Sequence, residues 1–306
     1  MANITLKGFV KTAGLSFQDI VSEKLDDILT YDSEKFSKTG ILLKDDAANY
    51  MQFTGTGLTY KTSGGEVVGI SAGTLTSFKV VSDGITIISE TGLSLAGKTL
   101  SAALDSGSTA KFLAALLSGN DTITGTTYAD TFWGANGDDK LYGGNGNDKL
   151  SGDNGNDQLF GESGNDTLTG GAGNDLLNGG VGNDILRGQA GNDTLTGGAG
   201  KDTFIFDTAL SASTNVDKIT DFNVADDTIQ LENAVFTKLT KTGPLASSAF
   251  YASTSGKAHD ADDRIIYETD TGKLIYDSNG NASGGEVLIA TLSKNLALTH
   301  ADFVII

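Results

Sequence analysis

Aspartate recurs at every ninth residue through the middle of the chain, and carboxylates at such a spacing can bind cations. Eight nine-residue units counted from Gly134 carry Asp at the sixth place. These aspartates are Asp139, Asp148, Asp157, Asp166, Asp175, Asp184, Asp193 and Asp202, and the phase extends back to Asp130 and Asp121. If the units stack about 4.8 Å apart, as strands do, two neighbouring carboxylates repel by about 3.5 kcal/mol at an effective dielectric constant near 20. A cation must therefore lie between the turns, and carboxylate and carbonyl oxygens suit Ca²⁺.

The other places of each unit supply a turn and a strand that would position these carboxylates. The first six places are rich in Gly, Asn and Asp, which is typical of a turn, and the last three indicate a minimal strand. The eighth place is always apolar, with Ile123, Phe132, Leu141, Leu150, Leu159, Leu168, Leu177, Leu186, Leu195 and Phe204. Because one unit alone buries almost nothing, we expect the units to stack around one continuous core.

The units resemble the G-G-x-G-x-D-x-U-x nonapeptide of the RTX (repeats-in-toxin) family. The resemblance implies a mainly all-β protein built on a right-handed parallel β-roll, in which two units make one coil and several Ca²⁺ ions lie between turns two units apart. On this model one edge carries Asp139, Asp157, Asp175 and Asp193, and the other carries Asp148, Asp166, Asp184 and Asp202. Backbone carbonyls near the ions would come from Gly137, Gly146, Gly155, Gly164, Gly173, Gly182 and Gly191.

Two of the repeat's places deserve separate predictions. The fourth place is glycine in all units except the one with Tyr128, so its backbone requires positive φ or close approach of another atom. The second place departs from glycine at Ala135, Asp153, Glu162 and Gln189, but a carbonyl ligand needs no glycine, so we expect these sites to survive. Leu116 and Tyr128 mark the first two units as caps without full sites. The alternative is a Gly/Asn-rich solenoid that holds no metal.

Charge and composition narrow the function classes. The net charge of the 306-residue chain is −18. Residues 119–206 hold thirteen acidic and four basic residues, so they carry half of this net charge. This balance argues against nucleic acid or an anionic membrane as an electrostatic partner. Without Ca²⁺ the same charge should keep the repeats expanded. Because the chain has no cysteine, it has no disulfide framework and no thiolate metal site.

The sequence also bears on localisation. The first residues, MANITLKGFVKTAGLSF, lack the apolar region of a Sec signal peptide, and no apolar run is long enough for a transmembrane segment. Composition alone would favour the cytoplasm. The family resemblance implies instead a secreted, extracellular protein that leaves a Gram-negative bacterium through the type I secretion apparatus, directed by an uncleaved C-terminal signal. The acidic and apolar ending, residues 299–306, is similar to such signals and is equally typical of a final strand.

We predict three domains from these patterns. Residues 1–118 form a small β-rich N-terminal domain of unknown role, residues 119–206 form the calcium-binding β-roll, and residues 207–306 form a capping and secretion-signal domain. In the first domain, strands are predicted at residues 4–10, 50–53, 66–70, 75–81 and 85–89, with a turn at residues 83–84. Helices are predicted behind Ser16, at residues 100–104 and at residues 110–117.

Motifs for catalysis are weak. Residues 69–73, Gly-Ile-Ser-Ala-Gly, match the G-x-S-x-G nucleophile elbow around Ser71, but a strand-like run follows where the elbow needs a helix. We interpret these residues as a tight β-turn. The two histidines, His259 and His300, lie far apart and do not form the H-E-x-x-H zinc motif. We identify no catalytic residues and no organic cofactor site, and we expect no enzymatic activity.

The C-terminal region resembles the domain that follows the repeats in serralysin-type RTX proteins. The matching residues are 200–207, 217–222 and 227–231. Phe204, Phe206 and Phe222 would cover the apolar end of the roll. A further Ca²⁺ would be held by Asp217, Asp221 and Asp227.

Two turns are predicted further along this region. Residues 269–272, Thr-Asp-Thr-Gly, indicate a hairpin between strands at residues 264–268 and 273–276. Residues 277–281, Asp-Ser-Asn-Gly-Asn, start like an EF-hand loop. They lack its glycine at the sixth place and its glutamate at the twelfth, so we interpret them as a turn with weak potential for metal binding.

Together these patterns predict a secreted, non-enzymatic calcium-binding RTX protein that folds on extracellular Ca²⁺. Its role would be adhesion or interaction with a surface or matrix, with residues 1–118 contacting polysaccharide or another cell-surface component. One alternative is a membrane-active, channel-forming NodO-like factor. A second alternative is a hydrolase with an unrecognised N-terminal active site.

Overall fold

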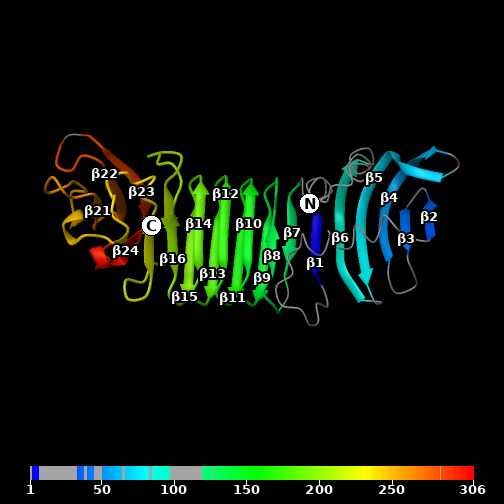
Figure 1. Ribbon diagram of the computed structural model, residues 1–306, viewed down its shortest axis with the longest axis horizontal. Coiled ribbons are helices and arrows are strands. Elements are labelled where there is room, and N and C mark those ends of the chain that lie inside the picture. The colour runs from blue at the N-terminus through cyan, green and yellow to red at the C-terminus, as the bar shows by residue number, and fades with distance from the viewer. Residues whose placement is uncertain are drawn as a thin grey trace. The chain divides into compact units, whose positions relative to one another are not determined.

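The protein is almost entirely β-structure in its described part (Figure 1). This computed structural model describes the backbone of residues 2–6, 33–37, 40–44, 50–63, 66–82 and 85–96. It describes residues 119–125, 127–282 and 284–306 with their side chains. Two compact units result, residues 1–142 and residues 143–306. The predicted all-β class is confirmed, and the three predicted domain boundaries remain predictions.

Unit 1 contains a run of neighbouring strands in the order β2-β3-β4-β5-β6-β1-β7-β9. Strands β2 to β6 and the β1–β6 pair are antiparallel, whereas β1–β7 and β7–β9 are parallel. The strands are β1 (Ala2–Leu6), β2 (Ser33–Ser37), β3 (Gly40–Lys44), β4 (Tyr50–Ser63), β5 (Glu66–Ser82), β6 (Ile85–Ala96), β7 (Asp121–Thr124), β8 (Thr131–Trp133) and β9 (Lys140–Asn145). Strands predicted near residues 4, 50 and 85 are confirmed. The predicted helices and the turn at residues 83–84 lie outside the described residues.

The tight turn predicted at residues 69–73 is wrong. Strand β5 runs through these residues, so the two strands predicted on either side are one. Thr59 pairs with Ala72 and Tyr60 pairs with Ile70, which leaves Ser71 as the extra residue of a β-bulge. Pairing with the long neighbouring strand β4 outweighs the local preference of glycine for turns. Because no helix follows Ser71, the nucleophile-elbow geometry is absent there.

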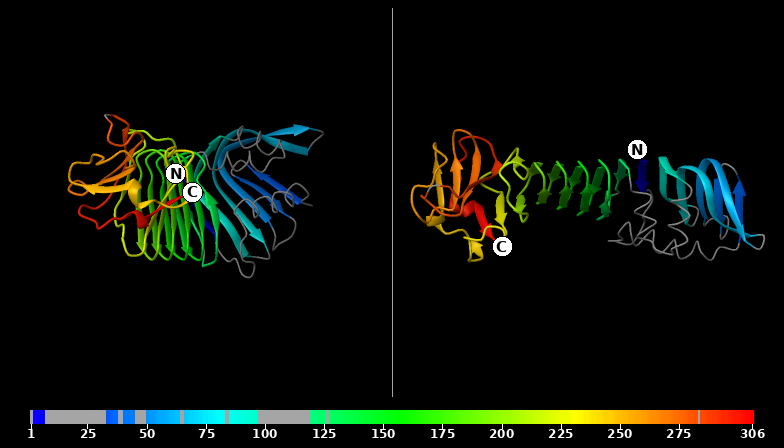
Figure 2. Two further views of the ribbon diagram at one scale, coloured as in Figure 1. Left: turned by 60° about the vertical axis from the view of Figure 1, so that its left-hand side comes forward. Right: turned by 90° about the horizontal axis from the view of Figure 1, so that it is seen from above.

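The repeats of unit 2 form two parallel sheets whose strands alternate along the chain. Strands β10, β12, β14 and β16 lie in one sheet, and β11, β13 and β15 lie in the other. Their bounds are β10 (Lys149–Asn154), β11 (Gln158–Ser163), β12 (Thr167–Ala172), β13 (Leu176–Val181), β14 (Ile185–Ala190), β15 (Thr194–Ala199) and β16 (Thr203–Phe206). Each strand pairs with the strand two units further on (Figure 2). The predicted parallel β-roll with two units per coil is confirmed.

The eighth-place side chains form the core, as predicted. In one sheet Leu159 pairs with Leu177, which pairs with Leu195. The ten apolar residues at this place, from Ile123 to Phe204, are each at most 2% exposed. Full burial of such a side chain contributes about 1.5–3 kcal/mol, so the single apolar residue per unit is the main source of packing energy in the repeats.

The C-terminal part of unit 2 continues both sheets and then departs from the repeat. Phe204 of β16 pairs with Ile229, and Ile229 pairs with Phe303, so the apolar ladder extends beyond the last unit. The elements are β17 (Asp217–Ile219), β18 (Thr228–Leu231), β19 (Gly243–Pro244), η1 (Ser247–Ala249), β20 (Phe250–Ser253), β21 (Ile265–Glu268), β22 (Lys273–Asp277), β23 (Glu286–Thr291), η2 (His300–Asp302) and β24 (Phe303–Ile305). Strand β24 fits the predicted final strand.

Aromatic side chains close the end of the repeats. Phe204, Phe206 and Phe222 are all at most 8% exposed. The rings of Phe204 and Phe222 lie 6.0 Å apart, and those of Phe250 and Phe303 lie 5.4 Å apart. These contacts fit the predicted covering of the roll's apolar end.

The hairpin predicted at residues 269–272 is confirmed by the antiparallel β21–β22 pair. In the described part of the chain, no helix has the length and hydropathy of a membrane span.

Candidate metal centre

The sixth-place aspartates form two buried columns, one along each edge of the repeats. Within unit 2, Oδ1 of five of these aspartates accepts a hydrogen bond from the backbone N–H of the aspartate one coil earlier. The N···O distances are 2.7–2.9 Å for the pairs Asp148–Asp166, Asp157–Asp175, Asp166–Asp184, Asp175–Asp193 and Asp184–Asp202. In unit 1, Asp139 accepts the same bond from Asp121 at 2.6 Å. The alternation predicted for the two edges is therefore present in the fold.

The second oxygen of these carboxylates is what points to a metal. Oδ2 is buried and has no hydrogen-bond partner in Asp166, Asp175, Asp184, Asp193 and Asp202. The five residues are at most 3% exposed. A buried carboxylate oxygen without a partner costs several kcal/mol if the group is ionised. A stack of such oxygens is stabilised only by protons or by cations.

The first-place glycines form the wall next to these oxygens, a role that the sequence analysis did not assign. A Cβ on Gly161 would overlap Asp166 Oδ2 and would lie 2.5 Å from the carbonyl oxygen of Gly179 in the next coil. Gly170 has the same relation to Asp175 and to the carbonyl oxygen of Gly188. Each Oδ2 thus faces a space that only glycine leaves open. The invariance of glycine at the first place is the sequence pattern from which this role could have been predicted.

A ladder of asparagines at the fifth place was also missed. The Oδ1 of Asn165 accepts a hydrogen bond from the backbone N–H of Asn183 in the next coil, at 2.7 Å. Asn147, Asn156, Asn174 and Asn183 make the equivalent bond. This ladder runs in the opposite direction to the bonds of the aspartates. It fixes the turns in register. The recurrence of Asn directly before Asp is the sequence pattern from which this ladder could have been predicted.

Backbone conformation explains the second and fourth places. In the eight units counted from Gly134, the fourth-place glycines have φ between 120° and 152°, which confirms the predicted need for positive φ there. Non-glycine residues at the second place also have positive φ, at Ala135, Asp153, Glu162 and Gln189, with values of 69–74°. The left-handed conformation costs such residues about 1–2 kcal/mol. The turn geometry is therefore kept where the repeat departs from glycine.

The columns strongly perturb the ionisation of their carboxyl groups. Burial, together with the charges of the neighbouring column aspartates, raises the pKa of Asp175 and Asp184 to about 7 against the opposing effect of a backbone hydrogen bond. Burial also raises the pKa of Asp166, Asp193 and Asp202. In the metal-free chain near neutral pH, part of these carboxyl groups would therefore stay protonated. A divalent cation that binds the carboxylates would displace those protons.

The columns end at the three aspartates predicted to bind a further ion. Asp217 Oδ1 accepts the backbone N–H of Asp193 at 3.1 Å, and Asp227 Oδ1 accepts that of Asp202 at 3.0 Å. Both residues thus occupy the position of a sixth-place aspartate. Asp221 accepts the N–H groups of Gly197 and Gly198 at 3.0 and 2.8 Å, beside the Asp202 turn. The fold brings Asp202, Asp221 and Asp227 together, whereas Asp217 ends the other column. At the N-terminal end, Asp130 is 8% exposed.

Comparison with known proteins agrees with this geometry. The family model of the RTX calcium-binding nonapeptide repeat (four copies) matches residues 117–150, 151–186 and 179–208. The chain carries an RTX calcium-binding repeat region. Its repeats bind Ca²⁺, and the stacked aspartates fit several ions. RTX repeats are typical of secreted proteins.

A solved structure similar to part of the chain is the AlgE6R3 subunit of the Azotobacter vinelandii mannuronan C5-epimerase. The match has 23% sequence identity and a TM-score of 0.25, and it covers 61% of this chain and 78% of that one. No curated protein sequence matches the chain.

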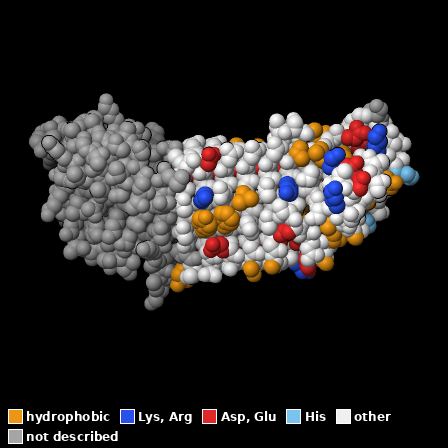
Figure 3. All heavy atoms as spheres, turned by 180° about the vertical axis from the view of Figure 1, so that it is seen from behind, with side chains coloured by type: hydrophobic (Ala, Val, Ile, Leu, Met, Phe, Trp, Pro, Cys, Tyr) orange, Lys and Arg blue, Asp and Glu red, His pale blue; other side chains and the backbone are white. Residues whose placement is uncertain are grey.

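The donor set of the RTX repeat region fits Ca²⁺. The buried carboxylate Oδ2 atoms and the first-place carbonyls are hard oxygen donors, and the repeats contain no histidine, cysteine or methionine that could add a nitrogen or sulfur ligand. Bound Ca²⁺ would supply the positive charge that the columns lack. On the face drawn in Figure 3, this region shows only a few scattered acidic side chains, because the column aspartates are buried.

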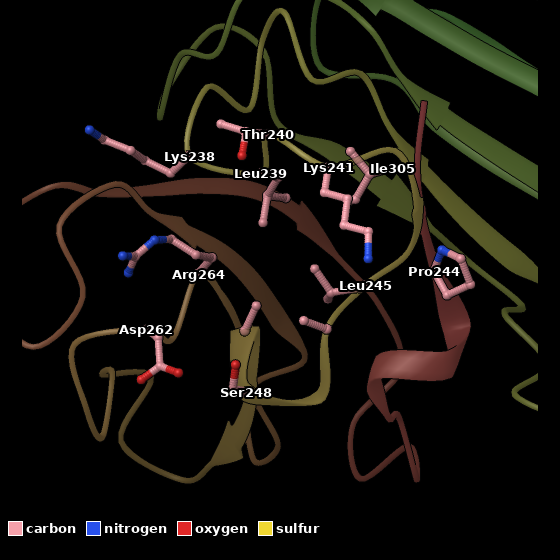
Figure 4. Close-up of a pocket in the computed structure, with 12 residues that line it drawn as sticks. Lys238, Leu239, Thr240, Lys241, Pro244, Leu245, Ser248, Asp262, Arg264 and Ile305 are labelled. Carbon is pink, nitrogen blue, oxygen red and sulfur yellow. The ribbon is translucent and has the colours of Figure 1, made fainter.

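A separate cavity of about 340 Å³ lies in the C-terminal part of unit 2 (Figure 4). Leu239 and Leu245 lie near its centre, and the side chains of Lys238, Arg264 and Lys241 surround them. The three basic side chains make no ion pair with another described residue. Asp262 is the one acidic residue of the lining, so in a chain with a net charge of −18 the cavity still has a local excess of positive charge.

Proposed function

We propose that the chain is a secreted, non-enzymatic protein whose RTX repeat region folds when it meets extracellular Ca²⁺. The observation that carries the proposal is the column of buried Oδ2 atoms without hydrogen-bond partners in Asp166, Asp175, Asp184, Asp193 and Asp202. The sixth-place aspartates would be the anionic ligands. Because the site exists only when successive coils are stacked, metal binding and folding of the repeats would be one event.

This coupling suits passage through the type I secretion apparatus of a Gram-negative bacterium. Where Ca²⁺ is scarce, repulsion within the columns keeps the repeats expanded. Outside the cell, Ca²⁺ neutralises the columns, so the chain folds only after export. The C-terminal part, which continues both sheets beyond the last repeat, would then cap the roll as the chain leaves the channel.

A Ca²⁺ titration of the whole chain, followed by far-UV circular dichroism, tests this proposal. We expect a cooperative gain of β-sheet signal, because each ion joins two coils and helps the next pair to form. Mg²⁺ is the matched control. It should give little change at the same concentration, since it demands a smaller octahedral site and gives up its water reluctantly. An identical spectrum with and without Ca²⁺ would refute calcium-dependent folding.

We further propose an adhesive role toward an anionic glycan or cell-surface component. The sequence assigned this contact to residues 1–118, of which no side chain is described. The cavity of Figure 4 offers a described candidate in the C-terminal part, because its apolar floor and the basic groups of Lys238, Lys241 and Arg264 suit a carboxylate-bearing sugar.

Binding of the Ca²⁺-loaded chain to arrays of acidic and neutral oligosaccharides checks this role. We expect acidic glycans to bind, and the double variant Lys238→Glu/Lys241→Glu to lose at least about tenfold in affinity, which corresponds to 1.4 kcal/mol. Lys257→Glu is the control, because Lys257 is an exposed lysine of the same region outside the cavity. Equal binding by the double variant and the control would exclude the cavity as the contact.

A further inference from the structure

Asp277, at the end of β22, carries the same feature as the aspartates of the repeats. The residue is 0% exposed. Its Oδ1 accepts the backbone N–H groups of Asn279 and Gly280 at 2.9 and 3.1 Å. Its Oδ2 is buried without a hydrogen-bond partner, as is Oδ2 of Asp166, Asp175, Asp184, Asp193 and Asp202 in the repeats. A position outside the repeats therefore repeats the feature that marks their calcium sites.

No basic side chain compensates the charge of Asp277 within the described residues. The backbone N–H of Asp277 donates to the carbonyl of Arg264 at 2.8 Å, so the two residues are neighbours. The Arg264 guanidinium, however, donates its Nη1–H to the carbonyl of Asp263 at 2.7 Å, and no ion pair joins it to Asp277. An ionised carboxylate that is buried in this way needs a cation from solution.

A second loop with a buried carboxylate lies against the Asp277 turn. The backbone N–H of Asn281 donates to the carbonyl of Asp260 at 3.0 Å. Gly280 is so close to this loop that a Cβ there would lie 2.5 Å from the carbonyl oxygen of Ala261. Asp263 is 3% exposed, and its Oδ2 accepts the N–H groups of His259 and Asp260. The two loops, residues 259–263 and 277–281, are thus each built around a buried aspartate.

The donors gathered here are mostly oxygens. Potential ligand atoms of His259, Asp260 and Asp263 lie within 4.8 Å of one another. The carbonyl oxygen of Ala261, in the same loop, faces Gly280 of the adjoining turn, and that turn begins at Asp277 with its buried Oδ2. His259 is exposed, and its Nδ1 lies 3.3 Å from Asp260 Oδ2, so it belongs to the rim. Two buried carboxylates with carbonyl oxygens and little nitrogen favour Ca²⁺ over transition metals.

We propose that residues 259–263 and 277–281 form a Ca²⁺ site that is separate from the RTX columns. Asp277 supplies the buried anionic ligand through Oδ2, and Asp263 supplies the second carboxylate. The ion joins the loop before β21 to the turn after β22. It therefore stabilises the open end of the β21–β22 hairpin. Calcium then orders the C-terminal part directly as well as through the repeats.

Native mass spectrometry of the whole chain at saturating Ca²⁺ counts the bound ions and tests the site. We expect Asp277→Asn, which keeps the shape of the side chain, to bind one ion fewer than the unmodified chain. Asp270→Asn is the matched control, because Asp270 is an exposed aspartate in the neighbouring β21–β22 turn; it should keep the full count. An unchanged count in Asp277→Asn would overturn the proposal.

A second variant tests whether Asp263 and Asp277 bind the same ion or act independently. Asp263→Asn should also lose one ion, and the double variant with Asp277→Asn should lose that same single ion. Loss of two ions from the double variant would contradict a common site. If Asp277→Asn does not fold, the count for Asp263→Asn decides alone, since its Oδ1 atom can still accept backbone N–H groups. The repeat ions are counted in the same spectrum, so failure of this site is distinguishable from failure of the RTX sites.

Discussion

Replacing Gly173 by alanine is expected to destabilise the Ca²⁺-loaded RTX repeat region by about 2–6 kcal/mol. Gly173 has a φ of 143°, a conformation that costs a residue with a Cβ about 1–3 kcal/mol. The new Cβ would also overlap the carbonyl oxygen of Gly155 in the preceding coil and would lie 2.6 Å from its carbon. Overpacking of this kind typically costs another 1–3 kcal/mol. The obstacle is the backbone of the preceding coil, so no side chain can rotate away to relieve it.

Urea unfolding at saturating Ca²⁺ measures this effect. Gly119→Ala is the control, because a Cβ there would meet nothing within 4 Å and the residue does not have positive φ. Its free energy of unfolding should change by at most about 0.5 kcal/mol. If Gly173→Ala unfolded at the same urea concentration as the unmodified chain, the coils would have to stack less closely at this place than the structure indicates.

The period of the sequence was enough to predict the repeats because it fixes both the phase and the register of the strands. Once every ninth residue is aspartate and the eighth place is apolar, Leu159, Leu177 and Leu195 can only pair with one another in a stack of two-unit coils. The role of the first-place glycines could not be read in this way. Glycine is equally invariant whether it serves a turn or clears space for Asp166 Oδ2, and only coordinates distinguish the two.

Long-range pairing was the part that local patterns did not predict. Residues 69–73 have the composition of a turn, yet pairing with β4 holds them in a strand with Ser71 in a bulge. The turn at residues 277–281 was correctly predicted as a turn. Its contact with residues 259–263 depends on the antiparallel pairing of β21 with β22, which brings Arg264 beside Asp277. No spacing in the sequence indicates that contact.

We expect the Ca²⁺-free chain to lose β-structure as the pH rises from 5 to 8, because the aspartate carboxyl groups of the columns ionise in this range. The pKa of Asp175 and Asp184 is raised to about 7 in the folded chain, and that of Asp217 is raised to about 8, mainly by burial. Their ordinary pKa is 3.8. Between these values the folded state holds protons that the unfolded state has released. The free energy of unfolding therefore falls as the pH rises through this window.

Saturating Ca²⁺ should reverse this dependence. Protons and Ca²⁺ compete for the same carboxylates, so acid weakens the Ca²⁺-loaded repeats, whereas alkali weakens the Ca²⁺-free repeats. Far-UV circular dichroism at pH 5 and pH 8, in Ca²⁺-depleted and Ca²⁺-saturated buffer, measures both trends. A β-sheet signal in depleted buffer that is equal at the two pH values, or larger at pH 8, would contradict the assigned ionisation.

Asp184→Asn shows whether charge or packing dominates in the columns. Asp184 lies between Asp166 and Asp202 in its column. At pH 8 without Ca²⁺, the variant should be more folded than the unmodified chain, because two repulsions of up to about 3 kcal/mol each are removed. With Ca²⁺ it should be less folded, and its titration midpoint should rise at least about tenfold, since carboxylate number sets calcium affinity. Glu162→Gln, which neutralises an exposed acid of the same repeats, should change neither quantity. A packing defect would destabilise the variant under both conditions, so only opposite signs identify the aspartate as a calcium ligand held at an electrostatic cost.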